Sequence, residues 1–487
     1  MQQLSGLDAS FLYFETPNAS THIGSFSIYD PSTMPGGRVT YEKLLTDLES
    51  RLHLARCFRQ KLARVPLDLD HPYWVEDASF DLEFHVRHIA LPRPGSWRQL
   101  CEQAARLHAR PLDLSRPLWE LYLIEGLGEM PAAPPGCFAV LMKIHHAAID
   151  GVSGIELMAA IHDTVADAPR PVPAKPWRPE PDPSALELLS RAVGNNIRSP
   201  FRLGRVLAQT VPGIRRYVEE QRRSRIEEIG ETPRTRFNGS VTQHRTVGGV
   251  AFDLGEIREI RKSVTGATVN DVILTICGGA LRAYLAAKKE LPATSLIAMC
   301  PVSVRREDEK GTAGNQVSTM SVAIRSDIAD PLERLQAVTD ASRHSKKLTE
   351  AIGARALTDM TQFVPGGLAG LGWRASSRLG LANRIRPFLN TVITNVPGPQ
   401  VPLYMSGAKL VVQYGMGPVM DGMGLIHPIG SYNGSAVISF TSCRELLPDP
   451  EFYEACIRES FAALKEATLG APPQLPPLRI VEKVPAA

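Results

Sequence analysis

The sequence predicts an α/β protein built from two similar halves, each an α+β sandwich. Apolar runs that suit buried strands alternate with segments of helical apolar spacing in residues 1–168 and again in residues 241–470. Residues 169–240 separate the two halves, because a proline-rich linker and a helical crossover lie there. Residues 471–487 are left as a tail.

The first half contains signals for a helix and for a buried strand. Thr40 is placed to cap a helix in which Leu44, Leu48 and Leu52 share one face. Residues 138–144 form a short apolar run that is typical of a buried strand. Helical spacing returns soon afterwards, at Val152, Ile155, Met158 and Ile161. This half therefore ends in a strand, a short junction and a helix.

The connection between the halves is first extended and then helical. Seven prolines fall between Pro169 and Pro183, a density that excludes a packed element and predicts a semi-rigid linker. Helical spacing follows in residues 184–229, with Leu186, Leu189, Val193 and Ile197 on one face. Residues 191–225 hold nine Arg and two Glu. Basic amphipathic helices can lie on anionic membranes, so this segment is either a peripheral membrane contact or an ordinary solvated face.

The second half repeats the alternation of strands and helices. Residues 296–301, 317–324 and 436–440 read as strands, and Asp449 followed by Pro450 is typical of a helix start. The apolar, glycine-rich residues 363–373 are too short to cross a bilayer. We interpret them as a flexible core loop, with a lipid-facing lid as the alternative.

The net charge, the cysteines and the apolar runs restrict the possible functions and locations of the protein. The 487 residues carry a formal net charge of +3, so general affinity for nucleic acid is not implied. Seven dispersed cysteines and an N-terminus without a signal-peptide pattern indicate a reducing, cytoplasmic location. The sequence has no run of 18 apolar residues that would span a bilayer, so any contact with the inner membrane or a lipid droplet is expected to be peripheral. The oligomeric state stays open.

Residues 145–151 read HHAAIDG, an HHxxxDG motif at the junction of a strand and a helix. A neutral imidazole suits the removal of a proton from an alcohol near pH 7. Adjacent strand residues point to opposite faces, so only one of His145 and His146 can face a given cavity. The alternative roles are purely structural: Asp150 can cap the following helix, and Gly151 can permit a tight turn. A metal site is disfavoured, because no further His/Cys cluster stands nearby.

Further blocks, spread along the chain, accompany this motif. They are residues 4–12 (LSGLDASFL) with 22–24 (HIG), 116–120 (RPLWE), 270–274 (NDVIL) and 394–399 (TNVPGP). In this order the blocks resemble the bacterial wax ester synthase/acyl-CoA:diacylglycerol acyltransferase family over about residues 1–465. One departure is visible, since the family usually has Pro-Met before the position of His22, where this chain has Ser20 and Thr21.

The resemblance implies two chloramphenicol-acetyltransferase-like subdomains and an O-acyltransferase. Such an enzyme moves a long-chain acyl group from acyl-CoA to diacylglycerol or a fatty alcohol, with no metal or cofactor. His146 is implied as the general base and His145 as a supporting residue. Asp150 and Gly151 are implied to shape the loop. Direct transfer is expected, because no GxSxG elbow marks a nucleophilic serine.

Substrate contacts are expected at three of the blocks. Thr268 and Asp271 have the spacing of a capping box, so Asn270 lies at a helix N-terminus, where an oxyanion or phosphate can bind. Pro117 and Trp119 either contact substrate or pack in the core. Thr394 and Asn395 precede a turn and are expected to line the substrate tunnel. All six are candidate substrate-binding residues: Asn270, Asp271, Pro117, Trp119, Thr394 and Asn395.

Two other functions stay open. A condensation-type enzyme would take its acyl group from a carrier-protein thioester, although the chain contains no recognisable carrier segment. A non-catalytic lipid-surface protein of the same fold is the second alternative, and the intact HHxxxDG motif speaks against it.

Overall fold

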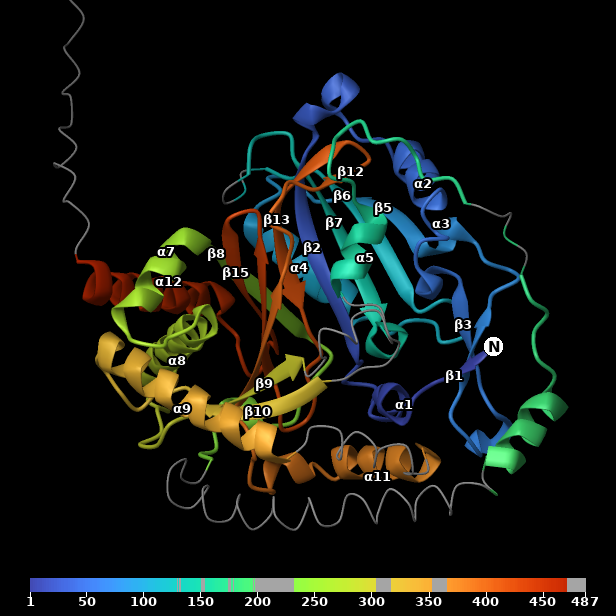
Figure 1. The fold of residues 1–487 in the computed structure, drawn as a ribbon. Coiled ribbons are helices and arrows are strands. Elements are labelled where there is room, and N and C mark those ends of the chain that lie inside the picture. Colours follow the sequence, from blue (N-terminus) through green and yellow to red (C-terminus); the bar gives the residue numbers. More distant parts are fainter. Residues whose placement is uncertain are drawn as a thin grey trace, which may run out of the picture.

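The computed structural model describes most of the chain, and its elements form two lobes (Figure 1). Each lobe is organised around a six-stranded sheet, as the sequence predicts for a mixed α/β fold. The described residues are 1–128, 130, 133–149, 154–173, 177, 179–195, 197, 232–303, 317–352 and 366–470.

The first sheet has the strand order β12-β13-β2-β7-β6-β5. Its strands are β2 (His22–Asp30), β5 (Val86–Ala90), β6 (Trp119–Glu125), β7 (Phe138–His145), β12 (Tyr404–Met405) and β13 (Ala408–Met416). The apolar run at 138–144 is thus a strand, and all of β7 is buried. Strands β12 and β13 come from residues 404–416, inside the segment that the sequence pattern placed in the second half. There β13 pairs antiparallel with β2, so the chain crosses back between the lobes.

Short elements surround this sheet. The helices are α1 (Gly6–Tyr13), α2 (Tyr41–Glu49), α3 (Leu82–His85), α4 (Trp97–Ala109) and α5 (Gly154–Ile161), and a small sheet joins β1 (Gln2–Gln3), β4 (Tyr73–Glu76) and β3 (Gln60–Ala63). Thr40 caps α2 as predicted, since its side chain accepts from the backbone N–H of Lys43. Leu44 and Leu48 then face the core. Local sequence chemistry therefore suffices to start this helix.

The second sheet has the strand order β10-β9-β11-β14-β15-β8. Its strands are β8 (Arg245–Asp253), β9 (Ile297–Ser303), β10 (Val317–Ala323), β11 (Thr391–Pro397), β14 (Leu425–Tyr432) and β15 (Ser435–Cys443). Strand β11 pairs parallel with β9 and β14, and the other neighbours in this sheet pair antiparallel. The three strands predicted for this half are confirmed. Its helices are α7 (Leu254–Ile260), α8 (Val269–Ala287), α9 (Pro331–Ile352), α11 (Gly366–Arg378) and α12 (Pro450–Leu469).

Helix α8 is the central helix of the second lobe. The predicted capping box is present, because Thr268 and Asp271 each accept from the other's backbone N–H. Among the described residues, α8 is the one helix long and apolar enough to cross a bilayer, and 72% of its apolar window is buried inside the lobe. It packs against α12, which begins at Pro450 as predicted. The Asp449 side chain accepts from the Tyr284 hydroxyl at 2.6 Å rather than capping α12.

Helix α11 corrects the interpretation of residues 363–373 as a loop. Residues 366–373 are helical, while 363–365 lie outside the described residues. Each glycine in a helix costs about 1 kcal/mol relative to alanine, so local propensity argues against this helix. Tertiary packing overrides that cost, because α11 lies against α1 and the Trp373 ring meets the Phe14 ring at 5.3 Å.

The helical pattern after the linker is only partly described. Residues 185–195 are helical, and residues 198–231 lie outside the described part. Leu188 and Ala192 pack against Val65 and Tyr73. The helix therefore docks through a face other than the apolar one of the sequence pattern, since Leu186, Val193 and Ile197 are exposed.

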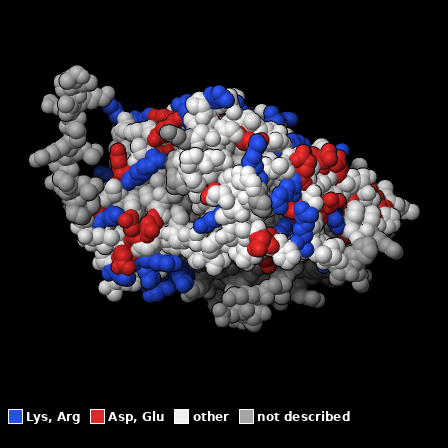
Figure 2. All heavy atoms as spheres, turned by 90° about the horizontal axis from the view of Figure 1, so that it is seen from above, with Lys and Arg blue, Asp and Glu red and all other residues white. Residues whose placement is uncertain are grey.

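The lobes meet through β13 and α4. Strand β13 contacts β14 and β15, and α4 lies on β8. Trp97 on α4 donates to Glu454 on α12 at 3.0 Å, and apolar side chains from both lobes share one buried cluster. On the face seen in Figure 2, basic and acidic side chains interleave, in keeping with the small net charge.

Short 3-10 helices complete the described elements: Pro31–Thr33, Pro35–Gly37, Arg56–Phe58, Pro66–Asp68, His146–Ile149, Arg236–Asn238, Arg261–Ser263 and Leu381–Asn383. The 3-10 helix His146–Ile149 contains part of the HHxxxDG motif. All seven cysteines are buried and unpaired.

Candidate active site

The HHxxxDG motif lies where β7 ends and a 3-10 helix begins. His145 is the last residue of β7, and His146 is the first residue of the 3-10 helix His146–Ile149. The next described element is α5. Asp150 and Gly151 lie outside the described residues. The two histidines have different surroundings, because His145 lies in the strand and His146 follows it.

His146 is the motif histidine that keeps some exposure. It is half-buried, whereas His145 is 0% exposed. The His146 ring stacks on Phe11 of α1 with 3.8 Å between ring centroids, and its backbone N–H donates to the Thr21 carbonyl at 3.0 Å. Burial lowers the pKa of His146 to about 4, so the imidazole is neutral at pH 7. Its buried Nδ1 has no hydrogen-bond partner in the described part of the chain.

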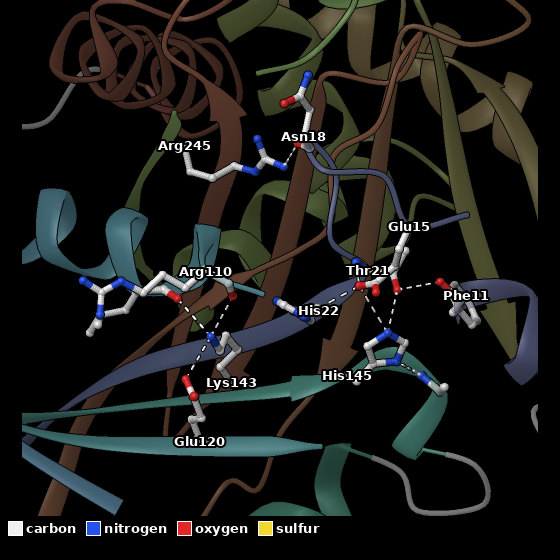
Figure 3. Close-up of polar contacts among 12 residues, drawn as sticks. Phe11, Glu15, Asn18, Thr21, His22, Arg110, Glu120, Lys143, His145 and Arg245 are labelled. Atoms are coloured by element: carbon white, nitrogen blue, oxygen red, sulfur yellow. Dashed lines mark hydrogen bonds and ion pairs between the residues drawn. The ribbon is translucent and has the colours of Figure 1, made fainter. Parts of the chain in front are cut away.

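His145 is held on both ring nitrogens. Its Nδ1 accepts from the Ala147 backbone N–H at 3.1 Å, so the ring hydrogen of the neutral form must sit on Nε2. That Nε2 lies 3.1 Å from the Thr21 hydroxyl and 3.3 Å from Glu15 Oε1 (Figure 3). A ring with both nitrogens engaged suits the supporting position that the resemblance implies.

The loop between α1 and β2 joins these two histidines to the rest of the molecule. Thr21 donates its backbone N–H to Glu15 at 3.0 Å and its hydroxyl to the Phe11 carbonyl at 2.8 Å. From the second lobe, Gln243 donates to the Pro17 carbonyl at 2.7 Å, and Arg245 donates to the Asn18 carbonyl at 2.6 Å. The loop is therefore fixed from both lobes.

Behind His145 lies a group of buried polar side chains. His22 pairs with His145 across β2 and β7, and desolvation holds the pKa of His22 well below its ordinary value. Lys143 is fully buried; its Nζ contacts Glu120 at 3.0 Å and donates to the Arg110 carbonyl at 2.9 Å. Desolvation lowers the pKa of Lys143, and Glu120 opposes that shift. These residues attach β7 to α4 and β6, so the strand that carries the motif is held rigidly.

The structure brings together two candidates from distant blocks. Asn395 on β11 donates to the Asn270 side-chain oxygen at 3.4 Å, so the N-terminus of α8 and the end of β11 meet. Asp271 is committed to the capping box, in which its Oδ2 accepts from the Thr268 N–H at 2.8 Å and from its hydroxyl at 2.7 Å. Thr394 precedes Asn395 on the same strand and therefore faces the opposite side of the sheet.

The Pro-Leu-Trp block packs in the core. Trp119 is 1% exposed, donates to the Phe58 carbonyl at 3.0 Å and stacks on His85. Pro117 is also buried. Between them, the Leu118 carbonyl accepts the backbone N–H of His145 at 2.9 Å. The structure thus gives Pro117 and Trp119 packing positions, and the block supports the motif through the backbone.

Sequence reasoning missed Phe11, Glu15 and Thr21 as site residues. Phe11 belonged to the first resembling block, and Thr21 was noticed only as a departure from the usual Pro-Met. Their contacts with residues 145 and 146 span more than 120 positions, so periodicity gives no sign of them. Within the described ranges, no three His, Cys, Asp or Glu side chains form a group that could hold a metal ion.

Comparison with known proteins identifies the same family that the sequence blocks resemble. Residues 4–273 match the wax ester synthase/diacylglycerol acyltransferase catalytic domain, and residues 313–465 match the C-terminal domain of that family. A putative diacylglycerol O-acyltransferase of Mycobacterium tuberculosis is 35% identical over 92% of this chain and 87% of its own length. A second from the same species is 32% identical over 95% of this chain and 99% of its own length.

Solved structures agree on the fold. The wax ester synthase/diacylglycerol acyltransferase from Marinobacter aquaeolei VT8 superposes with a TM-score of 0.68 and 26% identity, covering 96% of this chain and all of that one. The first condensation domain of the CDA synthetase, at a TM-score of 0.54 and 14% identity over 96% of this chain and 97% of that one, shares the fold alone. The family match and the named relatives show that the class of protein is an acyltransferase. The chain belongs to the wax ester synthase/diacylglycerol acyltransferase family.

Proposed function

We propose that this acyltransferase moves a long-chain acyl group from acyl-CoA to the hydroxyl of diacylglycerol, of a fatty alcohol, or of both. The observation that carries the proposal is His146, which is neutral, half-buried and at the end of a rigidly held strand. The family and the names of the relatives support the substrate classes.

In the proposed reaction His146 acts as a general base. Its lone pair takes the proton of the acceptor hydroxyl while that oxygen attacks the thioester carbonyl carbon. The tetrahedral intermediate then collapses, the carbon–sulfur bond breaks, and the imidazolium returns the proton to the leaving thiolate. Positioned bases typically supply about 10²- to 10⁴-fold in rate. No covalent acyl-enzyme, metal or cofactor enters this sequence.

The negative charge of the intermediate needs donors that are already in place. We propose Asn270 for this role, because it lies in the first turn of α8, where the helix dipole favours an anion. The contact from Asn395 to its oxygen orients the Asn270 amide group. Asp150 and Gly151 are proposed to shape the loop that follows His146.

A thiol-release assay tests the reaction. Purified protein is incubated with a long-chain acyl-CoA and either diacylglycerol or a fatty alcohol, and products are separated by thin-layer chromatography. We expect release of free thiol that depends on the acceptor, with an equal amount of new ester. Turnover only with an acylated carrier protein would instead support a condensation-type enzyme. Absence of turnover together with liposome binding would support a non-catalytic lipid-surface protein.

We also propose that the protein contacts an anionic lipid surface peripherally through the basic segment 191–225, at the inner membrane or a lipid droplet. The described residues at the start of this segment and directly before it support the proposal. Leu186, Val193 and Ile197 are 78%, 55% and 67% exposed beside Arg191. Exposed apolar side chains next to cations are typical of helices that lie in a membrane interface.

A further inference from the structure

Thr21 uses all of its polar groups to connect the two motif histidines with α1. The residue is 2% exposed. Its carbonyl accepts from the His146 N–H, its hydroxyl lies between His145 Nε2 and the Phe11 carbonyl, and its own N–H donates to Glu15. Figure 3 shows Phe11, Glu15 and Thr21 gathered around the His145 ring at the end of β7. We call Phe11, Glu15, Thr21 and His145 the Thr21 network.

The direction of each hydrogen bond is determined. His145 Nδ1 is an acceptor, so its Nε2 donates. The Thr21 hydroxyl hydrogen is directed to the Phe11 carbonyl, which leaves the hydroxyl oxygen free to accept from His145 Nε2. Every member of this buried chain is therefore satisfied, and such a network is expected to be rigid.

His146 is restrained by this network on two sides. Its backbone is fixed by the Thr21 carbonyl, and one face of its ring is covered by Phe11 at 3.8 Å and an interplanar angle of 14°. Because the Phe11 carbonyl also accepts from the Thr21 hydroxyl, the residue whose ring covers His146 and the His146 backbone are both tied to one residue, Thr21. Loss of that hydroxyl would leave His145 Nε2 with Glu15 alone.

We propose that Thr21 is a positioning residue for the general base, holding the His146 ring in the orientation that proton transfer requires. The inference rests on the proposed function and adds a residue to it. It depends on the Thr21 hydroxyl in particular, since a methionine side chain at this position would offer no hydroxyl to His145 Nε2. Misplacement of a reacting group by about 1 Å can cost about 10²-fold in rate.

Three variants test the proposal in the full-length enzyme with acyl-CoA and diacylglycerol. Thr21→Val keeps the shape and the backbone carbonyl but removes the hydroxyl, and we expect kcat to fall about tenfold while both KM values stay within about twofold. Thr21→Ser keeps the hydroxyl and should retain the wild-type kcat. Thr21→Met should behave like Thr21→Val. Circular dichroism and the thermal midpoint of each variant report whether it is folded.

A double-mutant cycle with Phe11→Leu provides a measurement that does not depend on one variant. If Phe11 and Thr21 hold His146 as a unit, the double variant should lose little more kcat than the worse single variant. The proposal is overturned if Thr21→Val keeps the wild-type kcat, if Thr21→Ser fails to restore it, or if the two losses multiply.

The same experiments separate this proposal from the proposed function. If the wild type is active and loses its activity on His146→Ala, while Thr21→Val is unchanged, only the positioning role fails. If the folded wild type shows no acyl transfer from acyl-CoA, both fail together. If Thr21→Val does not fold, the kcat of Thr21→Met against Thr21→Ser decides, and equal values overturn the positioning role.

Discussion

His146 in the first lobe and His427 in the second are both neutral and desolvated, but their hydrogen bonding differs. Burial lowers the pKa of His146 to about 4 and that of His427 to about 3. His427 is 0% exposed, and its two ring nitrogens contact the Thr391 hydroxyl at 3.0 Å and the Tyr453 hydroxyl at 2.6 Å. Desolvation is therefore common to both rings, and the difference in the described part of the chain is that His146 Nδ1 has no hydrogen-bond partner.

The two lobes also supply different groups. In the first, the proposed base His146 directly follows the end of β7. In the second, β11 ends beside the N-terminus of α8, where Asn395 meets Asn270. If the reaction occurs between these ends, the base and the oxyanion donor come from different lobes, and variants of each should affect the same step.

Replacement of His146 gives the largest expected effect. His146→Ala should lower kcat by about 10²- to 10⁴-fold, because the alcohol then has no positioned base. Thiol release per folded enzyme is the measurement, and an unchanged circular dichroism spectrum is the control. A variant that keeps a tenth or more of the wild-type rate would show that the base has been assigned wrongly.

Asn270 should come next. Asn270→Ala should lower kcat by about 10²-fold through loss of a donor to the tetrahedral intermediate. Asn395→Ala is the matched control and should lose less, because it leaves the Asn270 amide in place but no longer oriented. Equal wild-type rates for both variants would remove this end of β11 from the mechanism.

His427→Ala should change stability and leave the rate per folded enzyme intact. It leaves the buried Tyr453 hydroxyl without its partner and opens a cavity, so the free energy of unfolding should fall by about 3 kcal/mol. Urea denaturation monitored by fluorescence measures the loss. Tyr453→Phe should cost less, about 1 kcal/mol. A large loss of kcat in folded His427→Ala would contradict the comparison between the two histidines.

The pH dependence should be modest above neutrality. The folded-state pKa of His146 lies below its ordinary value of about 6.5, so the folded protein binds fewer protons than the unfolded chain between those values. The stability contribution is thus fully present above pH 6.5 and is lost as the pH falls from there toward about 4, whereas the base function follows the folded-state pKa and should be lost with a midpoint near 4. We expect kcat/KM to be flat from about pH 7 to 8. A midpoint near 6.5 would mean that the His146 ring is solvated in the active enzyme.

The smallest effect should come from the exposed helix after the linker. Replacing Leu186, Val193 and Ile197 by Ser should reduce binding to anionic vesicles several-fold, since each apolar side chain adds a small transfer free energy. Val172→Ser, at another exposed position, is the control. If the triple variant floats with the vesicles as the wild type does, this helix face is an ordinary solvated surface and does not bind lipid.

Local patterns predicted what local chemistry determines. The Thr40 cap, the capping box at Thr268 and the buried strand β7 all depend on residues within a few positions of one another. Helix α11 was missed because packing on α1 outweighs its glycines, and the helix at 185–195 docks through Leu188 and Ala192 rather than through its regular apolar face. Strand alternation predicted only that one of His145 and His146 faces a given cavity, and the choice of His146 came from the family resemblance. The contacts of Phe11 and Thr21 could not be predicted, because they depend on how α1 and the loop after it pack against the end of β7.

Strand β13 limits how this enzyme can move. Residues Lys409 to Met416 are hydrogen-bonded to β2 in the first sheet, while the chain on either side of them, β11 and β14, belongs to the second. A hinge motion that separated the lobes would have to break the backbone hydrogen bonds between β13 and β2 one after another. We therefore expect acyl chains to enter and leave through rearrangement of loops while the two lobes keep their relative position, and not through opening and closing of the lobes.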